Sequence, residues 1–384
     1  MKENVKLFIA GDYCSANRIE RLAEAGEVGK IFNDLLSHIQ SADLSIVNLE
    51  CVVTSSDQVI EKTGPALKAK PSAIKALKDA GFDMVTLANN HIMDFGAEGL
   101  SNTIKCLKEN NTGFVGAGMN SSEASETSYI TLKGHRIAIV NISENEFSTT
   151  SDDSPGAHSL NVIQNYHILQ KARQQADFVI LIVHGGHEMY QLPSPRMKEL
   201  YRFYAEAGAS VLINHHQHCY SGFEVYKEVP IFYGIGNFIF DAYGSKNPKH
   251  TNTIWNEGFC VELTLAEDGL KYALVPYIQN MAEPGVRKIE GEDLQRFTKE
   301  VSALSEVIQD DKQLYNRFSE FCNKKKYIYT SYLEPFNNRL IRGLKKFKVL
   351  PYFFTKQQRR LHLNLVRCEA HKDVLLHVLK SLSS

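Results

Sequence analysis

The sequence predicts an α/β protein with a central sheet and a helical extension at its C-terminal end. Up to about residue 215, short apolar runs alternate with stretches of helical spacing. Strand patterns dominate from residue 222 to residue 276, and helical patterns follow beyond about residue 283. Because strands that alternate with helices are typical of parallel sheets, we expect an α/β domain over residues 1–282 and a helical extension over residues 283–384.

Length and composition limit the classes of function. The 384 residues are 43% hydrophobic and 23% charged, which is typical of a soluble globular protein with a sizeable core. Lysine and arginine number 43 and aspartate and glutamate 44, so the net charge is −1. This balance argues against wholesale binding of nucleic acid.

The cysteines and the apolar runs bear on localisation. Seven cysteines are scattered without a Cys-x-x-Cys motif, so neither a disulfide framework nor a zinc ribbon is indicated. The apolar run near the N-terminus is too short for a signal peptide, and no run reaches the roughly 18 residues of a membrane span. The sequence therefore predicts a cytoplasmic protein.

Three predicted strands in the first part of the chain each end at polar residues. The strand over residues 5–10 leads to Asp12, the strand over 44–49 leads to Glu50, and the strand over 82–88 leads to Asn90 and His91, with Asp94 close behind. Helices are predicted over 27–40, 71–79 and 97–110. The carboxyl ends of parallel strands are where open α/β sheets place ligands.

The same pattern continues in the second part of the chain. A hairpin is predicted over residues 129–142, followed by helices over 160–174 and 195–207. The apolar strand over 177–183 leads to His184 and then Glu188. The run Val211–Ile213 leads to the cluster His215, His216 and His218. Imidazoles this close together favour a metal site over a core.

Each of these residues also has an ordinary interpretation. Asp12 can be a helix N-cap, Asp94 can cap the helix at Ala97, and Glu188 can anchor a loop. The histidine cluster can be a polar surface loop. Four strands with such endings, followed by the cluster, are hard to attribute to chance, and the sequence therefore predicts a shared site.

The extension carries a basic and aromatic segment. Strands over 222–226, 231–233, 237–240, 258–265 and 270–276 precede it, and helices are predicted over 291–308, 311–322, 327–346 and 357–382. Between Glu334 and Glu369 there is no acid, whereas nine lysines and arginines interleave with Phe336, Phe347, Tyr352, Phe353 and Phe354. This segment is either the solvated face of packed helices or a contact for an anionic membrane surface or polyanion.

These motifs, in their order and spacing, resemble the CapA family of capsule-synthesis proteins. The motifs are Gly11-Asp12, Asn48-Leu49-Glu50, Ala88-Asn89-Asn90-His91 with Asp94 and Gly96, His184-x-Gly186-x-Glu188, His216-Gln217-His218 and Tyr233 to Phe238. The family is associated with poly-γ-glutamate capsules and is similar in fold to calcineurin-like metallophosphoesterases. Over about residues 5 to 280, the resemblance implies a four-layer sandwich of two mixed sheets flanked by helices.

The resemblance also implies a role for each residue. Two divalent ions, Mn, Fe or Zn, are implied. Asp12 and His218 resemble ligands of the first, Asn90, His184 and His216 ligands of the second, and Glu50 the bridging carboxylate. His91 resembles the general acid or oxyanion donor, and we include Asp94 and Glu188 with it as catalytic candidates. The phosphoesterases carry a histidine two residues after the first aspartate, whereas this chain has Cys14.

Three functions remain open at this point. The first is a dinuclear metal-dependent hydrolase, a phosphoesterase acting on an anionic small molecule or polymer in capsule or surface-polymer biosynthesis. The second is a non-catalytic assembly or polymer-binding factor of a capsule-synthesis complex, with the basic segment at a membrane; Cys14 favours this alternative. The third is amide chemistry on γ-glutamyl chains.

Overall fold

The structure is a computed structural model that describes residues 2–62, 64–151, 153–247, 253–332, 338–347, 349–350 and 355–367. The chain forms two compact units, Met1–Leu314 and Tyr315–Ser384. The first unit contains two large sheets and every predicted site residue. Each unit is described by itself below.

The first large sheet is mixed. Its strand order is β18-β17-β16-β1-β2-β5-β6, and β15 also pairs with β1. Strands β1, β2, β5, β6 and β15 run parallel to one another. The pairs β1–β16, β16–β17 and β17–β18 are antiparallel. The strands are β1 (Val5–Cys14), β2 (Leu44–Leu49), β5 (Met84–Thr86), β6 (Gly113–Val115), β15 (Asn237–Phe240), β16 (Glu257–Ala266), β17 (Gly269–Gln279) and β18 (Val286–Lys288).

The second large sheet is also mixed, with the strand order β13-β14-β12-β11-β9-β8. Its centre is parallel and its two edges are antiparallel hairpins. The strands are β8 (Ser128–Leu132), β9 (His135–Ser143), β11 (Phe178–His184), β12 (Val211–His215), β13 (Phe223–Tyr226) and β14 (Val229–Phe232). The hairpin turns at Lys133-Gly134, as predicted.

Alternation along the strands explains why the two sheets pack face to face. In β11, Ile180 and Ile182 point into the core between the sheets, whereas Leu181 points to the opposite face. Leu7 of β1 lies in the same inter-sheet core, whereas its neighbour Phe8 lies on the other side of the first sheet. Each central strand is therefore apolar on both faces, which requires a second layer over each sheet.

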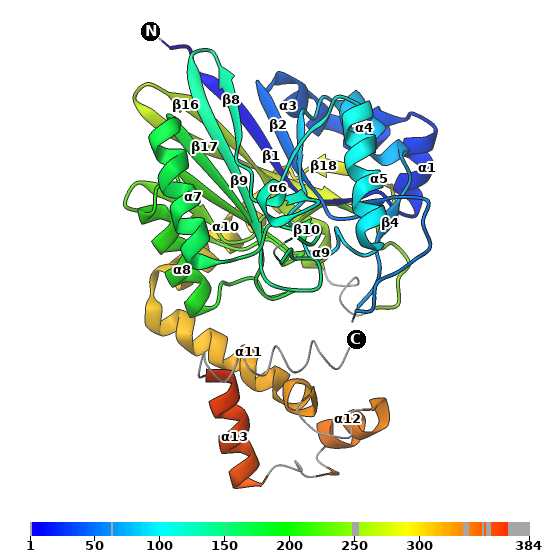
Figure 1. Ribbon diagram of the computed structural model, residues 1–384, viewed down its shortest axis with the longest axis vertical. Helices are drawn as coiled ribbons and strands as arrows, with labels where there is room; N and C mark the ends of the chain where they lie inside the picture. The colour runs from blue at the N-terminus through cyan, green and yellow to red at the C-terminus, as the bar shows by residue number, and fades with distance from the viewer. Residues whose placement is uncertain are drawn as a thin grey trace. The chain divides into compact units, whose positions relative to one another are not determined.

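Helices provide the outer layers. Figure 1 shows α7 and α8 beside one sheet and α3, α4 and α5 on the opposite side of the pair. The four-layer fold that the resemblance implied is confirmed. The helices of these layers are α1 (Arg18–Glu24), α2 (Val28–Phe32), α3 (Leu36–Ser41), α4 (Ser72–Ala80), α5 (Gly96–Glu109), α7 (Val162–Gln175) and α8 (Pro195–Glu206).

Some local features differ from the predictions. The single helix predicted over 27–40 is wrong: α2, a 3-10 turn Asn33–Leu35 and α3 replace it, because Asn33 has a positive φ of 43° that an α-helix does not tolerate. Short elements also went unpredicted. They are α1, β3 (Val52–Val53), β4 (Lys68–Ala69), α6 (Ser121–Ala124), β10 (Gly156–Ala157), α9 (Thr253–Asn256) and β18, whereas the edge strand β6 and the short β7 (Ala117–Gly118) fall within a strand predicted over 112–118.

Helix α10 (Gly291–Gln309) belongs to the first unit. Its buried Phe297 and Val301 join the inter-sheet core, and the Phe297 ring lies 4.6 Å from the ring of Tyr220. The boundary between the two compact units falls after Leu314. Helix α10 completes the apolar core, which its amphipathic pattern alone did not reveal.

The second unit is helical. Helix α11 (Asp311–Tyr332), most of which belongs to this unit, runs without a break where two helices were predicted, over 311–322 and 327–346. Helices α12 (Arg339–Lys346) and α13 (Lys356–Arg367) follow. Phe336, Lys348, Tyr352, Phe353, Phe354 and the predicted helical residues 368–382 lie outside the described residues.

Candidate metal centre

Asp12 lies inside β1, two residues before its end, rather than on a loop after the strand. The pairing of β1 with β2 and with β15 shifts register around Asp12, which is paired with Asn48 on one side and Asn237 on the other. Gly11 permits this because a Cβ there would lie 2.0 Å from the carbonyl oxygen of Gly236. The local irregularity re-aims the Asp12 side chain at the sheet edge, as bulges near active sites do.

The other predicted ligands reach the same edge from neighbouring strands. Glu50 directly follows β2, and its backbone N–H donates to the Tyr13 carbonyl at 3.0 Å. His184 is the last residue of β11. Asn90 follows β5, and its carbonyl accepts a hydrogen bond from the Ser148 hydroxyl at 2.7 Å. Parallel strands in both sheets thus deliver polar side chains to one place.

His216 and His218 have left-handed backbone conformations, with φ of 84° and 55°. This region is uncommon for residues other than glycine and costs of order 1–3 kcal/mol where it is held in place. The His216 N–H donates to Oδ2 of Asp12 at 3.2 Å, which holds the loop against β1. The strain supports a functional role for the loop that carries both imidazoles.

The structure brings the six predicted metal residues together in two overlapping groups. In the first, Nε2 of His184 lies 3.0 Å from Oδ1 of Asn90, 3.1 Å from Nδ1 of His216 and 3.4 Å from Oε1 of Glu50. In the second, His218 lies 3.6 Å from Oδ2 of Asp12 and 3.7 Å from Oε1 of Glu50. Glu50 is common to both groups, in the place where a bridging ligand would stand.

The chemistry of these donors fits divalent cations. Glu50 is fully buried, and neither of its carboxylate oxygens has a hydrogen-bond partner among the residues that the structure describes. Burial, followed by the nearby charge of Asp12, raises the pKa of Glu50 well above its usual range. Burial also raises the pKa of Asp12. Buried acids of this kind need a compensating positive charge, and oxygen and imidazole donors suit Mn, Fe or Zn.

The imidazoles are also in the form that binds metals. Burial lowers the pKa of His184 well below its usual value, and the neighbouring imidazoles lower it further. Burial lowers the pKa of His218 despite the opposing charge of Asp12. Both rings are therefore neutral near pH 7, and neutral imidazole is the ligand form.

Two asparagines orient the ligands from behind. Nδ2 of Asn48 donates to Oδ1 of Asp12 at 2.8 Å and lies 3.3 Å from Nδ1 of His184. Oδ1 of Asn237 lies 2.8 Å from Nδ1 of His218. Such contacts fix the tautomer and orientation of ligands. No role was predicted for Asn48, although its place in the motif Asn48-Leu49-Glu50 could have indicated one.

His91 and Asp94 form a buried pair beside the two groups. Nδ1 of His91 lies 2.7 Å from Oδ2 of Asp94, which also accepts the Leu67 N–H at 2.7 Å. The Lys62 ammonium forms an ion pair with Oδ1 of Asp94 and lies 3.2 Å from Nδ1 of His91. Asp94 does not cap the following helix, whose N-cap is Phe95. Lys62 was missed, because nothing in its local sequence points to the site.

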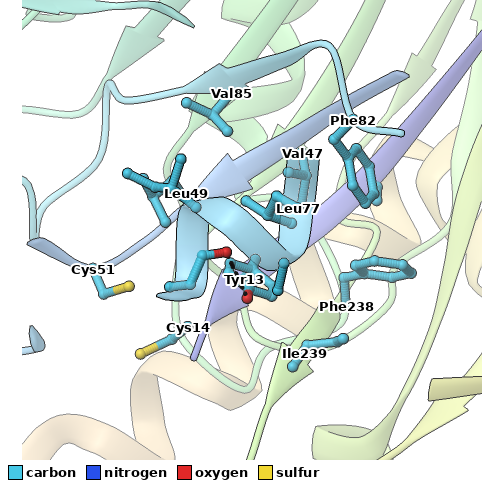
Figure 2. Close-up of a cluster of buried hydrophobic side chains, with 14 of the residues drawn as sticks. Tyr13, Cys14, Val47, Leu49, Cys51, Leu77, Phe82, Val85, Phe238 and Ile239 are labelled. Atoms are coloured by element: carbon cyan, nitrogen blue, oxygen red, sulfur yellow. Dashed lines mark hydrogen bonds between the residues drawn. The ribbon is translucent and has the colours of Figure 1, made fainter. Parts of the chain in front are cut away.

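Two further residues bear on the predicted site. Glu188, His91 and His218 line a cavity of about 760 Å³ that adjoins the ligand groups. Cys14 lies in the apolar cluster on the outer side of the first sheet, near Cys51, as Figure 2 shows. Within the described part of the chain, no candidate metal group includes a cysteine. Cys14 also lines the cavity that His218 lines.

His215 forms a third group with Asp12 and His184. It is fully buried, and neither ring nitrogen has a hydrogen-bond partner within the described ranges. Burial lowers the pKa of His215 to about 3, so the ring is neutral. His215 was predicted to lie in the histidine cluster, but no role was predicted for it.

Fold and site together define the class: a sandwich of two mixed sheets covered by helices, with buried carboxylates and imidazoles at one edge that could hold metal ions. The family model of the bacterial capsule synthesis protein PGA_cap matches residues 6–242, and the chain belongs to this family. The family resemblance drawn from the motifs is thereby confirmed.

Individual relatives agree with this assignment. The chain is 32% identical over 251 residues to the capsule biosynthesis protein CapA of Bacillus anthracis, a match that covers 62% of this chain and 61% of the relative. It is 29% identical over 240 residues to the PGA biosynthesis protein CapA of Bacillus subtilis (strain 168), covering 60% and 62%. The chain thus spans about three fifths of the length of these relatives.

Among solved structures, the chain is similar to a hypothetical protein from Thermus thermophilus. The TM-score is 0.46 and the sequence identity 16%, over 74% of this chain and 100% of that one.

In the part of the chain that the structure describes, no helix combines the length and the apolar character needed to cross a membrane.

Proposed function

We propose that this protein is a dinuclear metal-dependent hydrolase, a phosphoesterase that serves capsule or surface-polymer biosynthesis. The observation that carries the proposal is the convergence of six ligand-type side chains, from five strands or the loops that follow them, on one buried point. Asp12 and His218 would hold one cation, Asn90, His184 and His216 the other, and Glu50 would bridge them. When bound, such a pair polarises a phosphoryl group and activates water at neutral pH.

The chain's own residues would move the remaining proton. With Nδ1 of His91 directed at Asp94, Nε2 is the nitrogen left to face a substrate in the cavity that His91 lines. His91 would protonate the leaving oxygen through Nε2 when both ring nitrogens carry a proton, and Asp94 would orient the ring by accepting the hydrogen bond from Nδ1–H. Lys62 would offset the charge of Asp94. Glu188 would contact the substrate from another wall of the cavity.

The proposal is tested by metal content and turnover together. Purified protein should contain a divalent metal by elemental analysis, and it should hydrolyse aryl phosphates in a manganese-dependent way. His216→Ala and Glu50→Gln should lose metal and activity, whereas His167→Ala, at an exposed histidine on α7, should retain both. Protein that holds no metal in any divalent salt, or activity that survives in His216→Ala, would contradict the proposal.

A non-catalytic role as an assembly or polymer-binding factor of a capsule-synthesis complex is the second candidate. It is supported by Cys14, whose thiol lies in the apolar core and leaves the first cation without the ligand found at that position in phosphoesterases. This candidate predicts metal binding and binding of a γ-glutamyl polymer without cleavage of any phosphate ester. Amide chemistry on γ-glutamyl chains would instead release glutamate.

We also propose that the basic segment contacts an anionic membrane surface. Leu340 in α12 is 72% exposed, and Phe347, the residue directly after this helix, is 75% exposed. Arg339, Arg342 and Lys346 lie in the same short helix. Exposed apolar side chains beside basic ones are typical of helices that lie on anionic membranes.

A further inference from the structure

The cavity beside the candidate metal centre is built from segments that lie far apart in the sequence. His91, Glu188 and His218 form the part nearest the ligands. The remaining lining comes from Cys14 and residues 16–18, from Pro65 and Leu67, from residues 240–245 and Asn247, and from Trp255 of α9. Because His218 lines the cavity, a group bonded to a phosphoryl at the centre has room to extend into it.

Aromatic side chains begin directly at the metal centre. The ring of His218 lies 5.3 Å from that of Phe240 and 5.1 Å from that of Trp255, and these two rings lie 5.4 Å apart. Nε1 of Trp255 donates to the carbonyl of Phe240 at 3.3 Å, which fixes the pair. Further out, Tyr243 is 62% exposed and forms part of the rim. The wall beside His218 is therefore apolar and aromatic.

The positive charge in the cavity is already used. Among the described residues that line it, Arg18 is the one lysine or arginine. Its Nε and one terminal nitrogen donate to the two oxygens of Asp241 at 3.0 and 2.8 Å. Its other terminal nitrogen donates to the carbonyls of Met281 and Ala282, at 3.0 and 2.9 Å. Arg18 therefore braces the rim and has no charge to spare for a ligand.

A polyanion would find little to bind in such a cavity. The carboxylates of a γ-glutamyl chain need lysine or arginine partners, and the lining residues offer instead the additional acid Glu188. An apolar group would displace water from Phe240 and Tyr243 and gain roughly 25 cal/mol per Å² of buried apolar surface. The charge and the apolar surface of the cavity thus both favour an apolar group over a polyanion.

On the basis of the proposed function, we propose that the substrate is a phosphate monoester of an alcohol that carries an apolar group next to the ester. The metal centre would take the phosphoryl group, and the wall formed by Phe240, Tyr243 and Trp255 would take the apolar group. Water adds to phosphorus, the ester P–O bond breaks, and the alcohol leaves with one proton while phosphate is released. An aromatic ring and an alkyl or prenyl chain share this chemistry.

The test compares esters whose alcohols are similarly poor leaving groups. With the full chain and manganese, kcat/KM for benzyl phosphate should exceed that for glycerol 1-phosphate at least tenfold. Farnesyl phosphate distinguishes a chain from a ring. If its kcat/KM exceeds that of benzyl phosphate, the chain is the preferred apolar group. Equal kcat/KM for the benzyl and glycerol esters would overturn the inference. A γ-glutamyl oligomer with an inhibition constant below the KM of benzyl phosphate would overturn it as well.

Variants of the rim test the assignment to residues. Tyr243→Ser should lower kcat/KM for benzyl phosphate about fivefold and leave the value for glycerol 1-phosphate unchanged, and Tyr243→Phe should restore it. Tyr166→Ser, at a half-exposed tyrosine on α7 remote from the cavity, is the matched control and should change neither value. An equal loss for both esters in Tyr243→Ser would contradict a role in specificity.

Binding separates this inference from the proposed function. Benzylphosphonate cannot be hydrolysed, and calorimetric titration of the manganese-loaded protein should show it binding at least tenfold more tightly than methylphosphonate. If no ester is cleaved but this preference is found, the proposed function fails and the inference about the cavity stands. If both phosphonates bind equally, the inference fails whatever the turnover.

Discussion

Nε2 of His184 lies 3.0 Å from Oδ1 of Asn90, although 94 residues separate the two along the chain. The asparagine arrives from the first sheet, after β5, and the histidine from the second sheet, at the end of β11. The candidate metal centre therefore spans both sheets. Its ligands can be in place only when the sandwich is closed, so binding of a cation should also stabilise the fold.

Asn48 should control metal affinity without being a ligand. Its amide holds both Asp12 and His184, and loss of such outer contacts typically lowers metal affinity 10–100-fold. We expect Asn48→Leu to lower manganese affinity by this factor in a chelator competition assay. Thr86→Val removes only the hydroxyl that donates to Oδ1 of Asn48 at 3.1 Å and should have a smaller effect. A larger effect in Thr86→Val would contradict this order.

The buried pair of Lys62 and Asp94 should contribute strongly to stability. Both side chains are almost fully buried, and removal of one partner leaves an uncompensated buried charge. Lys62→Met should lower the free energy of unfolding in urea by about 3 kcal/mol. Adding Asp94→Asn should recover part of this loss, because the orphaned charge is then removed. If the double variant is less stable than Lys62→Met alone, the ion pair is not the cause.

His158 should make the protein less stable in acid. Burial lowers its pKa to about 4, whereas an unfolded histidine has a pKa near 6.5. The unfolded chain therefore binds a proton first, so this contribution is fully present above pH 6.5 and is lost as the pH falls toward 4. His158→Asn can keep the hydrogen bond that the Nδ1 of His158 makes to the Asn141 carbonyl. It should reduce the stability difference between pH 7 and pH 5 by about 2 kcal/mol.

The measurement is urea unfolding of metal-free protein at both pH values. The buried imidazoles of the metal centre have lowered pKa values as well, so some loss in acid should persist in the variant. An unchanged pH dependence in His158→Asn would show that His158 is not a source of it.

The end of the folded core should lie beyond α10. A chain ending at residue 282 would uncover Tyr220 and the apolar side chains that Phe297 covers, whereas a chain ending at Leu314 would keep this contact. We expect the longer fragment to unfold cooperatively and the shorter one to aggregate or melt without a transition. Phe297→Ala in the full chain should cost about 3–5 kcal/mol. Equal stability of the two fragments would make α10 dispensable.

The basic segment should bind vesicles through charge and apolar contacts together. The full chain should co-sediment with vesicles rich in anionic lipid and not with neutral ones, and added salt should weaken the binding. Leu340→Gln with Phe347→Ser should abolish it. Val225→Gln, at an exposed apolar position of the first unit, is the control. Equal sedimentation of the wild type and the double variant would remove the proposed role of α12.

Local patterns in the sequence predicted the α/β class and the convergence of polar residues at strand ends, whereas the four layers were implied by the family resemblance. Apolar runs such as Phe178–Val183 identify buried strands, and polar residues at their ends meet when the strands are parallel. The residues that were missed depend on contacts between distant segments. Lys62 reaches the site across a loop, and α10 completes a core whose other members lie far earlier in the chain. No local periodicity encodes such contacts.

Strand β15 joins two features of the molecule that have been described separately. Asn237, its first residue, aligns His218 at the metal centre, and Phe240, its last, forms the wall of the cavity. The four residues of β15 therefore connect the candidate metal centre to the cavity wall that would contact the organic group of a substrate. Binding of a cation should raise the affinity for the organic group. By reciprocity, binding of the organic group must raise the affinity for the cation by the same factor.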